Sequence, residues 1–466
     1  QKEDHPTLVY TTISFSGACG TFPRTAQLAM SADAKWWACA GALAATGATM
    51  VMASASPATL PPSSNSRMTS LMPALVLPAL YLIQMLRQNY RRASEPPVKF
   101  SWIPVLGSAL ELGQNAGEFF EQCEELGDIV KVTLAGVTTY LVTNAKLYSE
   151  VFRRATDFSF EEVKDDVGRR CWNIGFDMVH DSMGPIYTKE LRQKPSVDVL
   201  ARRANDALGE LLDAEIYRHT VPNKRETASS GDLFEIVSHV MFKATMITFF
   251  GNEFATDDQL RAFRDHDEAM PLLMGGFPLR ALRTASMGLE KHMELLREVS
   301  LQYGASNYIA ERYKAFAAHG FDSEQAARMQ LTQIWATIAN TLPTAFWVIY
   351  FIAWDSSLAE RVRGEVRRVT SGEQGASISP DQLADMPLLD SVVNEALRLA
   401  SGSMVIRKIG KDTTIGTEQG EEVSLRAGSD LLICPTQLHF NPEVFEAPRC
   451  FIADRFQQKK DEQTGN

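Results

Sequence analysis

Apolar and polar residues alternate in two short stretches early in the chain, over 129–134 (IVKVTL) and 138–143 (TTYLVT). Alternation of this kind predicts half-buried β-strands, and the short turn between the two stretches predicts a hairpin. Asn144 follows the second strand and can cap a helix, so we expect a short helix over 145–154.

Helical spacing of apolar residues dominates from Val199 onward. Residues 207–219 and 233–251 both place apolar side chains at i, i+3, i+4 and i+7, and Gly251 can end the second helix. Residues 160–195 show weak periodicity and mixed polarity, which predicts loops and short helices there. The whole pattern predicts a mainly α fold with small β-sheets.

The longest predicted helix covers 322–354, and Asp322 with Gln325 forms a capping-box sequence at its start. Between Arg328 and Asp355 lie 26 uncharged residues, of which seven are Gln, Thr or Asn. This stretch is too polar for contact with lipid. It favours a helix buried in the middle of a large domain.

Pro343 interrupts the hydrogen-bond ladder of that helix. Because it has no N–H to give to the carbonyl of Ala339, we expect a kink with a free backbone acceptor beside Asn340 and Thr341. One interpretation is a small-molecule site at the distorted turn. The other is a structural kink whose polar groups are satisfied by the protein.

Glu395 and Arg398 lie three residues apart in another amphipathic helix, over 386–402. Such a pair is either an exposed bridge worth roughly a few tenths of a kcal/mol or a buried pair that needs further hydrogen bonds. The apolar residues around it favour burial. Arg455 could then supply the additional hydrogen bonds.

Residues 1–67 differ in composition from the rest of the chain, with an Ala-rich stretch followed by Pro and Ser. One interpretation is a targeting segment, in which Lys35 precedes an apolar run and Ala53-Ser54-Ala55 resembles a cleavage site. The other is a spurious segment that is not translated, with Met68 as the true start. Either way, we expect residues 1–67 to be largely disordered.

Residues 68–86 are 19 uncharged residues between two arginines, about the length that an apolar helix needs to cross a bilayer. Arg87, Arg91 and Arg92 follow, which predicts by the positive-inside rule that the rest of the chain is cytosolic. The alternative is a buried helix of a soluble protein. A basic, proline-containing linker over 87–99 then leads to a catalytic domain over 100–466.

The composition narrows the classes of function. The 466 residues carry 46 basic and 57 acidic side chains, a net charge of −11 with no basic block, which argues against a nucleic-acid binder. Six cysteines without a C-x-x-C pair support neither a structural zinc site nor a disulfide framework. Reduced thiols in a domain that faces the cytosol fit this pattern.

Four features in this order resemble the cytochrome P450 family of haem-thiolate monooxygenases. They are the apolar anchor with its basic proline linker, the Ala339-Asn340-Thr341 sequence in the central helix, Glu395-x-x-Arg398, and the segment 441–456 that ends in Ala453-Asp454-Arg455-Phe456. The resemblance covers about residues 69–466. It implies a cytochrome P450 fold with an N-terminal membrane anchor.

Within the family, the chain looks most like the branch of sterol 7α- and 12α-hydroxylases and prostacyclin synthase. That branch has Asn instead of an acid before the groove Thr, and Pro shortly afterwards, as in Asn340, Thr341 and Pro343 here. The resemblance implies a haem b (iron protoporphyrin IX) cofactor, O2, a sterol or other small lipid substrate, and NADPH–cytochrome P450 reductase as partner.

The resemblance also implies roles for single residues. Thr341 hydrogen-bonds the oxygen at the haem iron and helps to deliver protons, and Asn340 replaces the usual acid beside it. Ala339 lines the cofactor, and Arg407, nine residues after Arg398, pairs with a haem propionate. Glu395, Arg398 and Arg455 lock the core beneath the haem and take no part in the chemistry.

One family feature is missing from these residues. The loop F-x-x-G-x-x-x-C-x-G, which carries the axial Cys, is not found in the 466 residues, and the chain stops at Asn466, ten residues after Phe456. Neither Cys434 nor Cys450 has the right surroundings, so no metal ligand is assigned. We therefore expect a P450 fold that is incomplete at the C-terminus, and a chain that is inactive by itself.

Two hypotheses follow for the protein as a whole. The first is a fragment of a monooxygenase anchored in the endoplasmic reticulum with a cytosolic catalytic domain, a plastid location being possible if residues 1–67 are a transit segment. The second is a truncated, non-catalytic membrane-associated protein. A haem-thiolate isomerase of the prostacyclin-synthase type is a further alternative, motivated by Asn340.

Overall fold

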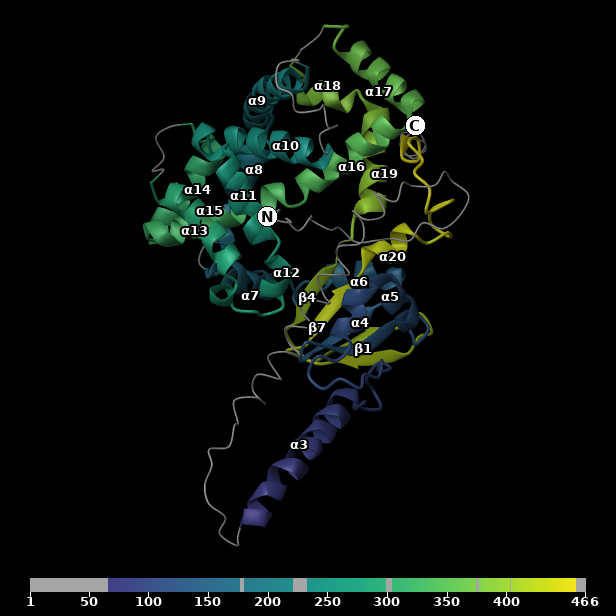
Figure 1. Ribbon diagram of the computed structural model, residues 1–466. Helices are drawn as coiled ribbons and strands as arrows, with labels where there is room; N and C mark the ends of the chain where they lie inside the picture. The colour runs from purple at the N-terminus through teal and green to yellow at the C-terminus, as the bar shows by residue number, and fades with distance from the viewer. Residues whose placement is uncertain are drawn as a thin grey trace, which may run out of the picture. The chain divides into compact units, whose positions relative to one another are not determined.

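The computed structural model describes residues 66–176, 180–220, 233–298, 304–373, 377–402 and 404–457. These residues form two compact units (Figure 1). Unit 1 contains the described residues up to Val163 together with Gly402–Arg449, and unit 2 contains Lys164–Ser401 together with those from Cys450 onward. The predicted segment 1–67 lies outside the described residues up to position 65.

Unit 1 is built on two small β-sheets. Its strands are β1 (Ile129–Leu134), β2 (Val137–Val142), β3 (Phe158–Ser159), β4 (Val405–Ile409), β5 (Thr413–Gly416), β6 (Glu422–Leu425) and β7 (Asp430–Ile433). The larger sheet has the order β1-β2-β7-β4-β3, in which β2 and β7 are parallel and the other neighbours are antiparallel. β5 and β6 pair by themselves as an antiparallel ribbon.

The helices of unit 1 are short except for the first. They are α3 (Ser66–Asn89), α4 (Ala109–Gln114), α5 (Ala116–Glu124), the 3-10 turn η1 (Ala145–Leu147), α6 (Tyr148–Arg153) and α20 (Pro435–His439). The two faces of the larger sheet are buried in separate clusters, one containing Tyr140 and Leu431 and the other Leu141 and Leu432. Successive strand residues point to opposite faces, so each strand contributes to both.

Unit 2 is helical, and α7 (Glu161–Trp172) leads into it from unit 1. Its remaining elements are α8 (His180–Leu191), α9 (Lys194–Thr220), α10 (Leu233–Phe249), η2 (Asn252–Phe254), α11 (Asp257–Asp267), α12 (Met270–Met274), η3 (Leu279–Ala281), α13 (Arg283–Glu298), α14 (Asn307–Ala318), α15 (Ser323–Ile338), α16 (Thr341–Trp354), α17 (Ser356–Val369), α18 (Pro380–Ala384) and α19 (Pro387–Ala400). Its largest buried cluster gathers around α10, α11, α13 and α15.

The early hairpin and the helices of 233–251 and 386–402 are confirmed, and Asn144 caps the η1 turn by accepting from the amide of Lys146 at 3.0 Å. The short helices predicted within 160–195 are confirmed as α7 and α8, of 12 residues each. Their weak periodicity follows from partial exposure. Strands β4–β6 were not predicted, since each has only four or five residues.

One helical stretch with described side chains, Ser323–Trp354, could cross a membrane by length and composition. Its first half, α15, buries eight of its side chains in the core of unit 2. Burial of this extent is typical of the core helix of a globular domain. Polar members of that set, Gln330 and Thr332, hydrogen-bond within unit 2. The second half, α16, buries only Leu342, Trp347 and Phe351, so the expected burial is confirmed for α15 and not for α16.

Candidate active site

The central helix is divided in two at Ala339 and Asn340. The capping box of Asp322 and Gln325 begins α15 as predicted, and α15 ends at Ile338. A new helix, α16, begins at Thr341. The expected kink at Pro343 within one continuous helix is therefore replaced by a break one turn earlier, because the proline ring displaces the carbonyl four residues before it, that of Ala339.

The break is held by Thr344. Its hydroxyl donates to the carbonyl of Asn340 at 2.7 Å, and its amide donates to the same carbonyl at 3.3 Å. Asn340 has φ −98° and ψ −33°, distorted from helical values, and its side chain does not cap α16. The hydroxyl bond competes with the i→i−4 amide bond of the helix for this one carbonyl, which loosens the helix at its first turn.

The turn presents two polar side chains. Thr341 and Asn340 are both exposed, and Ala339 packs against the core of unit 2. Within the described residues, neither the Asn340 amide nor the Thr341 hydroxyl has a hydrogen-bond partner in the protein. Exposed side chains of this kind are hydrated by solvent, so this geometry fits both interpretations of the kink.

Glu395 is the centre of a buried ionic group in unit 2. Its carboxylate accepts from Nε and Nη2 of Arg398 at 2.7 and 2.8 Å, and from Nε of Arg455 at 2.9 and 3.0 Å. The amide of Ile452 donates to the same carboxylate at 3.0 Å. Both guanidinium groups also donate to the carbonyl of Cys450 at 3.2 Å.

This ionic group joins α19 to the segment 450–456. The side chains of Glu395, Arg398 and Arg455 are 0%, 2% and 8% exposed, so their charges are almost completely removed from water. A buried ion pair requires good geometry and saturated hydrogen bonding to offset its desolvation. The contacts described above meet that requirement, which accounts for a fixed position of residues 450–456.

Ser391 belongs to the same arrangement, although the sequence analysis did not single it out. Its hydroxyl donates to the carbonyl of Ala453 at 2.6 Å and accepts from the amide of Phe456 at 3.0 Å. It lies one turn before Glu395 on the same face of α19. That i, i+4 spacing is the signal that could have identified it. Nearby, Phe351 of α16 stacks on Phe451 with ring centroids 4.2 Å apart.

Arg407 lies in unit 1, on strand β4. Its guanidinium lies over the rings of Phe152 and Phe160, 5.4 and 4.9 Å from their centroids, and donates to the carbonyl of Ile406 at 2.9 Å. Burial lowers the pKa of Arg407. Among the described residues it forms no ion pair, so this cation is available to an anionic ligand.

The described cysteines do not fit the thiolate ligand of a haem. Cys123, Cys171 and Cys434 are buried, and burial raises the pKa of each thiol, to about 12 for the first two. A thiolate is the form that binds a metal. Within the described ranges, no cluster of His, Cys, Asp and Glu has the arrangement of a metal site. We therefore derive no step through the haem.

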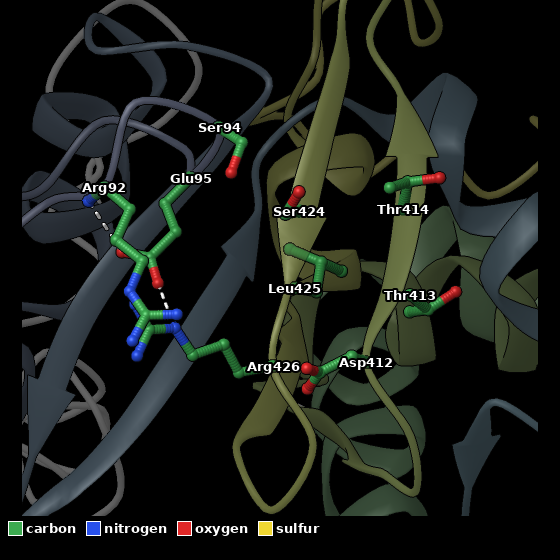
Figure 2. A pocket seen from close by; sticks show the side chains of 9 residues that line it. All are labelled: Arg92, Ser94, Glu95, Asp412, Thr413, Thr414, Ser424, Leu425 and Arg426. Carbon is green, nitrogen blue, oxygen red and sulfur yellow. Dashed lines mark hydrogen bonds and ion pairs between the residues drawn. The ribbon is translucent and has the colours of Figure 1, made fainter.

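A polar hollow of about 300 Å³ in unit 1 contains none of the predicted site residues (Figure 2). It lies between the linker and the β5–β6 ribbon, and Glu95 in its wall is an ion-pair partner of Arg426 and of Lys131 at 2.9 Å. Burial alone would raise the pKa of Glu95, but Lys131 and the amide of Arg92 outweigh it and hold the pKa below its usual value. These contacts attach the linker to the sheets, which is a structural role.

The fold and the site together define a mainly helical protein with small β-sheets, a central helix broken at a polar turn, and a buried E-x-x-R pair completed by a downstream arginine. The family model of cytochrome P450 matches residues 96–466. The chain belongs to the cytochrome P450 family.

Curated relatives place the chain in the sterol and prostacyclin branch, as the resemblance implied. Cytochrome P450 7A1 of Oryctolagus cuniculus is 28% identical over 81% of this chain and 78% of its own length. The 5-beta-cholestane-3-alpha,7-alpha-diol 12-alpha-hydroxylase of Sus scrofa is 26% identical over 81% and 78%. Prostacyclin synthase of Rattus norvegicus is 27% identical over 78% and 77%.

A solved structure has the same fold. The cyanobacterial P450 CYP120A1, determined with retinoic acid bound, aligns with a TM-score of 0.60 over 78% of this chain and 82% of its own. The sequence identity is 17%, so this likeness concerns the fold alone. It confirms the mainly helical P450 architecture expected from the sequence.

Proposed function

We propose that this chain is the catalytic part of a haem-dependent monooxygenase that hydroxylates a sterol or another lipid. O2 is the oxidant, and NADPH–cytochrome P450 reductase supplies the electrons. The observation that carries the proposal is the family match over 96–466 together with relatives whose names include a sterol hydroxylase. The haem of this family supplies the O2 chemistry when bound.

The roles proposed for the chain's own residues follow their placement. The amide of Asn340 orients a ligand at the broken turn, and the hydroxyl of Thr341 carries protons between that ligand and solvent. Ala339 lines the site, and Arg407 binds a carboxylate of the cofactor. Glu395, Arg398 and Arg455 hold the fold and do not touch the substrate.

The membrane proposal rests on α3, which includes the whole of the predicted anchor 68–86. Its described side chains from Pro78 onward are largely exposed, including Leu80, Leu82 and Ile83. Exposed apolar residues on a helix disfavour the alternative of a buried soluble helix. We propose that α3 anchors the protein in the endoplasmic reticulum, with the catalytic domain in the cytosol.

The test is turnover of a sterol by the full-length gene product in membranes that contain the reductase. With NADPH, we expect a product that gains one oxygen atom, detected by mass spectrometry. Thr341→Ala should lower the rate about a hundredfold if the hydroxyl takes part in proton transfer. Thr370→Ala is the matched control, because that hydroxyl only donates to the carbonyl of Val366 at the end of α17. Equal rates in both variants would contradict the role of Thr341.

An isomerase is the second candidate, and Asn340 is the observation that favours it. An amide cannot relay protons as a carboxylate does, and rearrangement of a peroxide needs no such relay. Prostacyclin synthase is among the relatives of the chain. Steady NADPH consumption in step with hydroxylated product would exclude this candidate, whereas conversion of a lipid peroxide without NADPH would support it.

A further inference from the structure

The segment after the linker exposes apolar side chains to an unusual extent. Phe100, Ile103 and Val105 are exposed, and Trp102 is 69% exposed. Phe100 and Trp102 form an edge-to-face pair with ring centroids 4.8 Å apart. We call residues 100–105 the aromatic loop. Exposed apolar residues that cluster in this way mark a surface that contacts another apolar phase or partner.

The described part of α3 exposes apolar residues in succession. Leu80, Tyr81, Leu82 and Ile83 are all exposed. Consecutive helical residues are separated by about 100°, so four of them point around the entire helix. A helix that packs on a protein core would hide one side. This pattern is suited to lipid, which surrounds a helix on every side.

Polar side chains at the end of α3 bind the aromatic loop to the helix. Gln88 donates from Nε2 to the carbonyls of Ser101 and Ile103 at 3.1 and 3.0 Å, and its Oε1 accepts from the amide of Val105 at 3.1 Å. Asn89 exchanges two hydrogen bonds with the backbone of Ser101, at 2.8 and 2.9 Å.

Two turns earlier on α3, the hydroxyl of Tyr81 donates to the carbonyl of Trp102 at 2.7 Å. These contacts satisfy the backbone of the loop at several successive positions and leave its apolar side chains pointing outward. The loop is therefore positioned along the axis of α3 and cannot move freely relative to it. The aromatic loop lies beside the last two turns of α3.

The same level of the helix carries the residues typical of a bilayer surface. Arg87, Tyr90, Arg91 and Arg92 are all exposed there. Tyr and Trp favour the headgroup region of a membrane, and arginines beside it attract anionic lipids. A protein partner would explain the apolar residues, but it would not require aromatic and basic residues at the end of an apolar helix.

We propose that the aromatic loop inserts Trp102 into the headgroup layer of a phospholipid bilayer, at a depth set by its hydrogen bonds to Gln88 and Asn89. The inference rests on the membrane attachment of α3 proposed above and is independent of the proposed chemistry. The loop thus forms a second contact with the membrane beside the anchor. Two contacts limit the tilt of unit 1 against the bilayer.

Trp102 fluorescence tests the depth. The full chain is bound to vesicles of phosphatidylcholine and phosphatidylserine that carry bromine either near the headgroups or deep in the acyl chains. The chain has seven tryptophans, so the emission of Trp102 is obtained by subtracting the emission spectrum of Trp102→Phe from that of the parent protein. We expect the shallow bromines to quench this component at least about twofold more than the deep ones. Val444→Ser, a change at another exposed apolar residue of the same unit, should leave the difference unaltered.

The double variant Gln88→Ala, Asn89→Ala tests the positioning. It should still sediment with vesicles through α3, but the preferential shallow quenching of Trp102 should disappear. Vesicle-bound parent protein with unquenched Trp102 would overturn the proposal and leave the anchor intact. A parent protein that does not sediment with vesicles would overturn both. Neither result bears on sterol turnover, so failure of the proposed function is recognised separately.

Discussion

At the scale of single residues, Glu395 is the most tightly held side chain of the candidate site. One carboxylate faces the guanidinium groups of Arg398 and Arg455, and all three are shielded from water. These charges are not solvated by water, so removal of one partner leaves the others as buried, uncompensated charges. The group therefore controls stability, whereas the exposed Thr341 is placed to affect chemistry.

Replacement of Glu395 by Gln should cost about 3 kcal/mol of unfolding free energy, because two buried guanidinium groups lose their counter-charge. Urea denaturation followed by circular dichroism measures it. Glu360→Gln removes a carboxylate that pairs with Arg363 at the same i, i+3 spacing but in solvent, and should cost at most about 0.5 kcal/mol. Similar losses in both variants would show that the Glu395 group is not buried in solution.

His292 is a second residue with a specific expectation. It is 1% exposed, and within the described residues neither ring nitrogen has a hydrogen-bond partner. Burial, aided by the nearby His266, lowers the pKa of His292 to about 3. Burial also lowers the pKa of His266 to about 4. Between pH 6.5 and about 4, both imidazole rings are therefore neutral in the folded protein, whereas the same two histidines are protonated in the unfolded chain.

The sign of the pH dependence follows from this difference. Below pH 6.5 the unfolded chain binds more protons at these two positions, so the free energy of unfolding falls as the pH drops from 6.5 toward 4. Asp267 acts in the opposite direction, since burial raises its pKa to about 6 and the folded protein keeps its proton longer. Among these three buried groups, the two losses from the histidines outweigh the one gain from Asp267 on acidification.

His292→Leu should remove the contribution of His292 to this loss of stability at low pH. At pH 7 we expect little change or a slight gain in stability, because a buried unsatisfied polar ring is replaced by an apolar side chain. Between pH 6.5 and 4 the slope of the unfolding free energy should fall by about 1.4 kcal/mol per pH unit. Urea denaturation at several pH values measures the slope. An unchanged slope would show that His292 is protonated or solvated in the folded state.

At the scale of elements, the break between α15 and α16 is the feature that distinguishes the central helix. Pro343 is the third residue of α16, a position whose N–H has no partner within the helix. The proline is therefore tolerated by α16, but it prevents continuation of α15 into α16. This arrangement exposes Asn340 and Thr341 without a large cost in stability.

Pro343→Ala should join the two helices. We expect the amides of residues 340–344 to exchange at least about tenfold more slowly with solvent deuterium, since a regular ladder can form through the break. Stability should change by no more than about 1 kcal/mol. Pro387→Ala, at the first position of α19, serves as control and should leave exchange in its helix unaltered. Fast exchange of these amides in the Pro343→Ala variant would show that Pro343 does not cause the break.

At the scale of the whole molecule, the family match and the lack of a suitable cysteine lead to a direct expectation. The 466-residue chain supplied with haem should give no thiolate-type Soret band in its reduced, CO-bound spectrum. Three of the four described thiols are buried with raised pKa values, and Cys450 lies outside the sequence pattern of the axial ligand. Cys450→Ser should give the same spectrum. A thiolate-type band in the parent that is lost in the variant would identify Cys450 as the ligand.

Much of the site could be predicted because its signals are local. The capping box at Asp322, the spacing of Glu395 and Arg398, and the helix-breaking effect of Pro343 depend on neighbours within a few residues. The short strands of 405–425 were missed for other reasons. Strand β4 pairs with β3 and β7, which are remote in the sequence, whereas β5 and β6 form a local hairpin of only four residues a strand, too short for a clear alternation.

The sequence by itself determined the class of fold, the family and the identity of the polar turn, since periodicity and motif spacing are properties of the chain. Only the tertiary structure decided that Glu395 is buried with both arginines, that Ser391 joins them, and that the aromatic loop is bound to α3 by Gln88 and Asn89. Burial and long-range hydrogen bonds depend on which segments meet in space.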